Sequence, residues 1–129
     1  MATISRFEEL EIWQLARQQA NELYYIYSID LFAKDYELRN QISRSSGSVM
    51  DNIAEGFERS GNKEFLNYLI IAKASNGEVR SQLYRSIDRK YINNEKFEDL
   101  KLKCESLSKR ITSFIKYLKD SDRKGFRYP

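Results

Sequence analysis

The chain has 129 residues, of which 41% are hydrophobic and 32% are charged, and its formal net charge is +3. This length suits one domain with a real core, and this composition excludes disordered and membrane-spanning classes. One Pro, five Gly and a single Cys are too few for a β-sandwich or a disulfide framework, so we expect an all-α, cytoplasmic protein.

Apolar residues recur at helical spacing in four segments, at about residues 9–29, 35–57, 62–88 and 94–119. The last segment has the clearest stripe, which alternates by three and four residues from Phe97 to Leu118. Asn93 can cap this helix, and Ile92 can pack on Phe97 as a hydrophobic staple. The connections are short, so residues 1–120 are predicted to form one antiparallel, up-down-up-down four-helix bundle. Residues 121–129 are predicted to form a flexible basic tail.

The third segment contains Asn-Gly at positions 76 and 77, which is a hairpin signal when strands flank it. Its flanks are helical in period, so we expect one helix through Gly77. A glycine inside a helix costs about 1 kcal/mol relative to alanine. We expect Gly77 to be there because another backbone approaches it closely.

Polar residues form a second stripe beside the apolar one on the segments at 35–57 and 62–88. Ser and Asn are poor residues for an exposed helix, where Lys or Glu is expected, so tertiary contacts between the two helices should account for them. We call this stripe the polar seam and expect a buried or nearly buried hydrogen-bond network in it. Its predicted members are Gln41, Arg44, Ser48, Asn52, Glu55, Ser75 and Glu78.

Three stretches resemble a known family: "FEELEIWQLA", "QISRSSGSVMDNIAEGFERSGNKEF" and "IAKASNGEVRSQL". They are similar to the four-helix-bundle proteins encoded within 23S rRNA intervening sequences, to which the accessory proteins of diversity-generating retroelements are related. The resemblance extends to about Leu118, and one departure is Ala74, where the family usually has glycine. It implies a bundle that assembles into a ring, a homopentamer in known cases. For the retroelement relatives it also implies association with nucleic acid and a reverse transcriptase.

The chain contains no His, which removes the commonest general base and the His-dependent nucleophile and metal sites. Glu55 and Glu78 could face the interior together and bind a metal or share a proton, but such a site would need more ligands than the polar seam supplies. Cys104 lies in an apolar stripe and is expected in the core. The sequence therefore predicts no catalytic residue, no metal and no cofactor.

Charge is distributed unevenly along the chain. Residues 1–64 hold seven Lys and Arg against eleven Asp and Glu, a net charge of −4, whereas residues 65–129 hold fifteen against eight, a net charge of +7. The basic half could bind an anionic partner, or its charges could simply lie on solvated helix faces. Candidate nucleic-acid contacts are Arg85, Arg89, Lys90, Lys109, Arg110, Arg123, Lys124 and Arg127.

Seventeen aromatic residues exceed what one small core readily buries, and Tyr24, Tyr25, Tyr36, Tyr68 and Tyr84 lie partly outside the apolar stripes. Together with the resemblance, this favours a homo-oligomer. We expect a non-enzymatic, self-assembling scaffold or adaptor that docks a protein or ribonucleoprotein partner, such as a reverse transcriptase. The alternative is a ring that binds RNA or DNA through the basic half.

Overall fold

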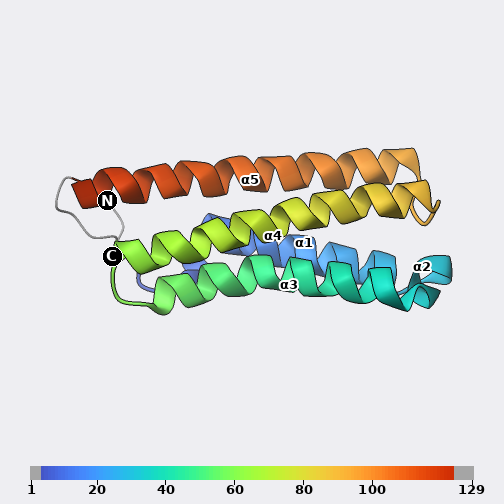
Figure 1. Cartoon of the computed structure of the whole chain (residues 1–129), viewed down its shortest axis with the longest axis horizontal. Helices are drawn as coiled ribbons and strands as arrows, with labels where there is room; N and C mark the ends of the chain where they lie inside the picture. The colour runs from blue at the N-terminus through green and yellow to red at the C-terminus, as the bar shows by residue number, and fades with distance from the viewer. Residues whose placement is uncertain (1–3, 124–129) are drawn as a thin grey trace.

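A computed structural model describes residues 4–123, with side chains for residues 4–121. Four long helices lie side by side and alternate in direction: α1 (Glu11–Tyr27), α3 (Tyr36–Glu58), α4 (Asn62–Asp88) and α5 (Asn94–Arg123) (Figure 1). A 3-10 turn, η1 (Phe7–Glu9), precedes α1, and a short helix, α2 (Asp30–Lys34), joins α1 to α3. The described residues contain no strand, which confirms the all-α class, and the four long helices agree with the predicted bundle. None of these helices is long and apolar enough to span a membrane.

Capping side chains and a glycine turn define where the long helices α3, α4 and α5 begin. The carboxylate of Asp35 accepts a hydrogen bond from the backbone N–H of Leu38 at 3.1 Å and caps α3. Asn93 caps α5 in the same way, with its Oδ1 2.7 Å from the backbone nitrogen of Lys96. Gly61 has a φ of 114°, which only glycine adopts readily, and this turn allows α4 to begin directly after α3.

Two predicted boundaries differ from the structure. The first helix ends at Tyr27 rather than at residue 29, because the chain turns before Asp30, which has a φ of 53°. The separate helix α2 was not predicted, since five residues are too few to show a periodicity. The last helix continues to Arg123 with Ser121 buried, so the predicted tail is wrong for its first three residues, 121–123. The rest of that tail lies outside the described residues.

The interior is filled by two apolar clusters, one towards each end of the bundle. The first includes Leu10, Ala16, Val49, Ile53, Leu69, Ala72, Ile111 and Leu118, and the second includes Leu23, Leu38, Ile42, Val79, Leu83, Phe97 and Leu100. Between them, by position along α1 and α4, lie two buried amides, Gln19 and Asn76. A polar layer therefore crosses the middle of an otherwise apolar core.

Two glycines inside helices differ in how closely a neighbouring helix approaches them. A Cβ on Gly56 would lie 2.7 Å from the Cβ of Tyr68 and 3.0 Å from the Cδ1 of Phe65, so α3 and α4 are in close contact there. A Cβ on Gly77 would meet nothing within 4 Å. One helix does run through Gly77, as predicted, but the expected close approach of another backbone is wrong within the single chain.

Candidate functional site

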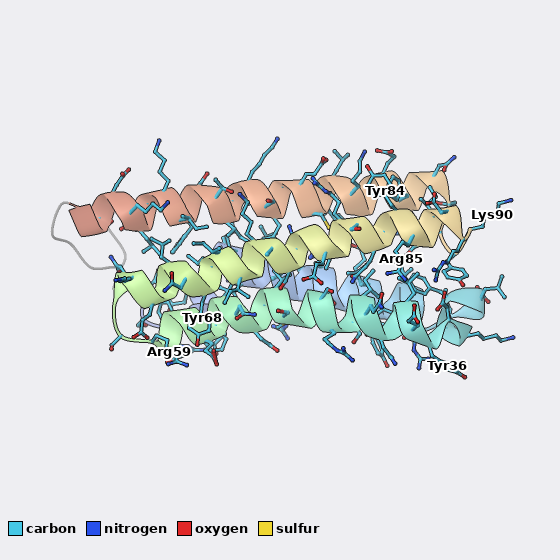
Figure 2. All side chains as sticks on the ribbon, viewed as in Figure 1. Tyr36, Arg59, Tyr68, Tyr84, Arg85 and Lys90 are labelled. Atoms are coloured by element: carbon cyan, nitrogen blue, oxygen red, sulfur yellow. The ribbon has the colours of Figure 1, made fainter. Side chains whose placement is uncertain are left out.

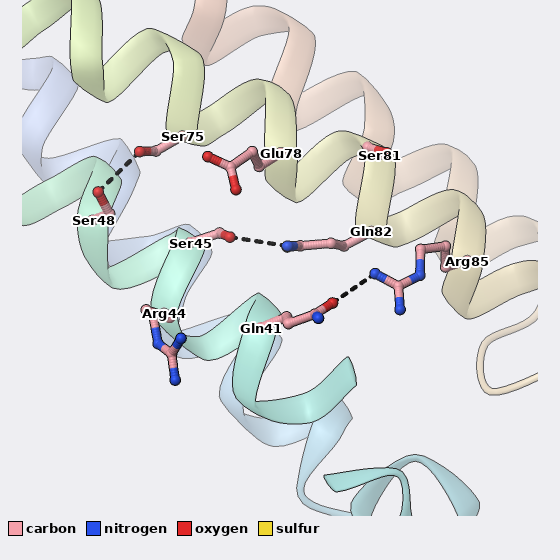
Figure 3. Close-up of a pocket in the computed structure, with 9 residues that line it drawn as sticks. All are labelled: Gln41, Arg44, Ser45, Ser48, Ser75, Glu78, Ser81, Gln82 and Arg85. Carbon is pink, nitrogen blue, oxygen red and sulfur yellow. Dashed lines mark hydrogen bonds between the residues drawn. The ribbon is translucent and has the colours of Figure 1, made fainter. Parts of the chain in front are cut away.

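A polar groove of about 530 Å³ lies between α3 and α4 (Figure 3). We call it the α3–α4 groove. Five of the seven predicted members of the polar seam line it, and only Asn52 and Glu55 do not. Its full lining is Gln41, Arg44, Ser45, Ser48, Ser75, Glu78, Ser81, Gln82 and Arg85. The small serine side chains leave space between two helices whose other contacts are close, which accounts for the groove.

Three side-chain hydrogen bonds cross from α3 to α4 along this groove (Figure 3). The hydroxyls of Ser48 and Ser75 are 2.9 Å apart. Nε2 of Gln82 donates to Oγ of Ser45 at 3.0 Å, and Nη1 of Arg85 donates to Oε1 of Gln41 at 2.6 Å. These bonds hold the walls in one arrangement, so the groove is preorganised for a ligand.

Asn52 supports the first of these bonds. Its Nδ2 donates to the backbone carbonyl of Ser48 at 2.8 Å and to Oγ of Ser48 at 2.9 Å, which orients that hydroxyl towards Ser75. Asn52 is half-buried, and its described bonds stay on α3. The predicted network therefore exists around Ser48, Asn52 and Ser75.

The two carboxylates of the polar seam do not face the interior, and this expectation is wrong. The Glu55 side chain is 54% exposed, lies 3.9 Å from Arg59 and accepts a hydrogen bond from the Tyr68 hydroxyl, which raises the pKa of that phenol. Arg59 and Tyr68 are labelled in Figure 2. Glu78 is exposed on the wall of the groove. Both positions lie at the outer edge of the polar stripe, beyond the serines that face the other helix. The described residues contain no group of three or more side chains able to hold a metal ion.

The groove presents two separate charges. Arg44 and Glu78 are both exposed, and neither has an ion-pair or hydrogen-bond partner among the described residues. Arg85, by contrast, is held by Gln41 and lies 3.7 Å from Glu37. A ligand in this groove therefore meets a free guanidinium from α3 and a free carboxylate from α4, with hydroxyl groups between them.

The predicted nucleic-acid contacts separate into two groups. Three are engaged in ion pairs: Arg85 with Glu37, Arg89 with Asp35 at 2.6 Å, and Arg110 with Glu11 at 2.6 Å. Lys90 and Lys109 are exposed and have no partner among the described residues. Arg123 ends α5, whereas Lys124 and Arg127 lie outside the described part of the chain.

The structure also brings together residues that the sequence analysis did not connect with one another. Lys73 and Arg80 on α4 lie beside Lys109 on α5. In the core, Nδ2 of Asn76 donates to the Cys104 carbonyl at 2.8 Å, and Oδ1 of Asn76 accepts from Gln19 at 3.1 Å. The signal for this buried link was present, because each amide occupies a position that continues the apolar stripe of its helix.

Comparison with known proteins adds to this geometry. The family model described as 23S rRNA-intervening sequence protein matches residues 8–113. Among solved structures, the chain is similar to a protein of unknown function from the S23 ribosomal protein family of Bacteroides thetaiotaomicron, with 25% sequence identity and a TM-score of 0.74. That match covers 81% of this chain and 98% of the other. Comparison with curated proteins gives no match.

Proposed function

This chain belongs to the 23S rRNA-intervening sequence protein family, and from that premise we propose that it is a self-assembling helical scaffold that docks a protein or ribonucleoprotein partner in the α3–α4 groove. The observation that carries the proposal is the groove itself. Three cross-helix hydrogen bonds hold its walls, while Arg44 and Glu78 have no partner in the part of the chain that the structure describes. A preorganised polar surface of this kind suits binding, and its charges and hydroxyls offer no activated nucleophile.

The charges define the partner's chemistry. Arg44 is suited to a carboxylate or a phosphate, and Glu78 is suited to a cation or an N–H donor. The partner segment should therefore carry both kinds of group within the length of the groove. A reverse transcriptase or a protein–RNA complex is the kind of partner that we propose.

Self-assembly is supported by apolar side chains that the single chain leaves uncovered. Tyr25 is 72% exposed, Leu31 63% and Tyr36 64%, although the core is complete without them. Exposed aromatic and aliphatic groups are typical of interface cores. With the family resemblance, a ring of five copies is the assembly that we favour.

Light scattering over a wide concentration range tests assembly. We expect a particle several times the 15.3 kDa of one chain, and we expect Tyr25→Ser combined with Leu31→Ser to shift it towards the monomer. Circular dichroism would check that the variant stays folded. A wild-type protein that remains monomeric at every concentration would contradict the proposal.

Site-specific photo-crosslinking tests docking. A photoreactive residue at Ser81, inside the groove, should give a discrete adduct in the producing cell, whereas the same residue at exposed Lys63 should not. The adduct should be lost when Arg44→Glu is added, because the guanidinium that holds the partner is gone. The same adducts from both positions would show that the groove has no specific occupant.

Binding of RNA or DNA by the basic half is a second candidate. The observation that favours it is the net charge of +7 in residues 65–129, with Lys90 and Lys109 unpaired among the described residues. Binding of a 23S rRNA fragment should weaken with salt, and Lys90→Ala with Lys109→Ala should reduce the slope of log K against log salt by about 1.5 to 2. An unchanged slope would show that these lysines do not contact phosphates.

A further inference from the structure

A second hollow, of about 580 Å³, lies between α4 and α5 and is cationic. Lys73 and Arg80 line it from α4, and Lys109 lines it from α5 together with three hydroxyl side chains. Its one carboxylate, Glu105, lies 3.6 Å from Arg80. Lys73 and Lys109 have no ion pair or hydrogen bond among the described residues. The hollow is therefore a surface with surplus positive charge and hydrogen-bond donors.

The outer face of α3 has the opposite character. Asp51 and Glu58 are exposed, and neither has an ion-pair partner among the residues that the structure describes. Ala54 lies between these two acids, and Gly47 lies one turn before Asp51, on the same face of the helix. This face is therefore acidic, with small residues that expose the backbone.

The two faces have the same spacing. On α3 the positions 47, 51, 54 and 58 follow steps of four, three and four residues, and on α4 the positions 73, 77, 80 and 84 follow the same steps. When the helices are laid antiparallel, Asp51 meets Arg80 and Glu58 meets Lys73. Asp51 and Glu58 are seven residues apart on α3, and Lys73 and Arg80 are seven residues apart on α4, which is about 10.5 Å along either helix. Both acid–base contacts can therefore form at once.

The same register places a small residue of α3 at each of the two remaining positions. Ala54 meets Gly77, and Gly47 meets Tyr84, whose side chain is 47% exposed (Figure 2). A Cβ on Gly47 or on Gly77 would meet nothing within 4 Å in the single chain. Each glycine costs a helix about 1 kcal/mol relative to alanine, and no contact inside the bundle requires it. A second copy packed on these faces supplies the missing reason, because it needs a close approach there.

We propose that the outer face of α3 of one copy docks antiparallel on α4 of the next copy, at the α4–α5 hollow, with Asp51 on Arg80 and Glu58 on Lys73. This inference rests on the proposed self-assembly and specifies one contact of its interface, separate from the exposed Tyr25, Leu31 and Tyr36. The two surfaces are different parts of the molecule, so the contact is heterologous. Repetition of a heterologous contact generates a ring when the rotation closes.

Charge reversal tests the pairing. Lys73→Glu with Arg80→Glu, and separately Asp51→Lys with Glu58→Lys, should each raise the dissociation concentration of the assembly at least tenfold at physiological salt. All four changes in one chain should restore assembly, because the charges are again complementary. Lys34→Glu with Lys63→Glu is the matched control, since both lysines are exposed and lie outside the two faces. Sedimentation measures assembly, and circular dichroism confirms that each variant folds.

Gly77→Leu tests the close approach without changing charge. Gly77 is exposed and a Cβ there meets nothing within 4 Å in the single chain, so the monomer should remain folded while assembly is lost. Unchanged assembly of this variant would overturn the inference, and so would a fourfold charge reversal that fails to restore assembly. If the wild type assembles but Lys73→Glu with Arg80→Glu removes only RNA binding, the hollow holds a nucleic acid and the inference is wrong. A monomeric wild type would instead defeat the proposed function.

Discussion

Asn76→Ala should destabilise the bundle strongly, although Asn76 is buried and does not line the α3–α4 groove. Asn76 is 1% exposed and joins three helices, because it donates to the Cys104 carbonyl on α5 and accepts from Nε2 of Gln19 on α1. Two hydrogen bonds contribute about 1 kcal/mol each, and the buried Gln19 amide left without an acceptor costs about another 1 kcal/mol. The expected loss in the free energy of unfolding is therefore about 3 kcal/mol.

Chemical denaturation followed by circular dichroism measures this loss, at one fixed protein concentration because assembly would make stability concentration-dependent. For a domain of this size the melting temperature should fall by about 12 °C. Asn67→Ala, at an exposed position of the same helix, is the control and should change stability by less than about 0.5 kcal/mol. Adding Gln19→Ala to Asn76→Ala should cost less than the sum of the two single changes, since no amide is then orphaned. A loss for Asn76→Ala no larger than the control's would refute the reasoning.

Four further outcomes are expected. Asn52→Ala should lower stability by about 1 kcal/mol in thermal melts, because its amide hydrogen bonds are lost but no buried group is left unpaired. Gly56→Ala should lower it by about 2 kcal/mol in the same assay, because the new Cβ would lie 2.7 Å from a side-chain carbon of α4. The Tyr91 hydroxyl holds the pKa of Asp35 below its usual value, so this carboxylate stabilises the fold above its unfolded-state pKa. That contribution is lost as the pH falls through the folded-state pKa, and Asp35→Asn should flatten the acid limb of the stability–pH curve. Burial raises the pKa of the Cys104 thiol to about 12, so a thiol reagent at pH 8 should label it only after denaturation, as mass spectrometry can show.

The long helices were predictable because the apolar residues that recur at helical spacing in the sequence are the residues that the bundle buries. On α5, Phe97, Leu100, Cys104, Leu107 and Ile111 are all buried, as the alternation by three and four predicts. The match of the family model confirms the resemblance that the quoted stretches showed. What periodicity could not provide was α2, since five residues make little more than one turn.

The site was predictable only in part, for a physical reason. Ser48, Asn52 and Ser75 interact as expected, because small polar residues inside a helix require a partner nearby. Glu55 and Glu78 continue the same stripe but are exposed. A shift of a few tens of degrees around the helix axis separates a contact with the next helix from a contact with water, and long side chains reach solvent from either position.

The direct connection between α3 and α4 has a consequence for the order of folding. Only residues 59–61 separate these helices, and the Ser48–Ser75 hydrogen bond spans 27 residues, whereas the Gln19–Cys104 contact spans 85. Contacts between residues close in sequence cost less loop-closure entropy and form earlier. We therefore expect the α3–α4 hairpin to form first and α1 to meet α5 last. On a growing chain, this hairpin is complete at residue 88, before any of α5 has been synthesised, so the partner-docking groove can form before the bundle closes.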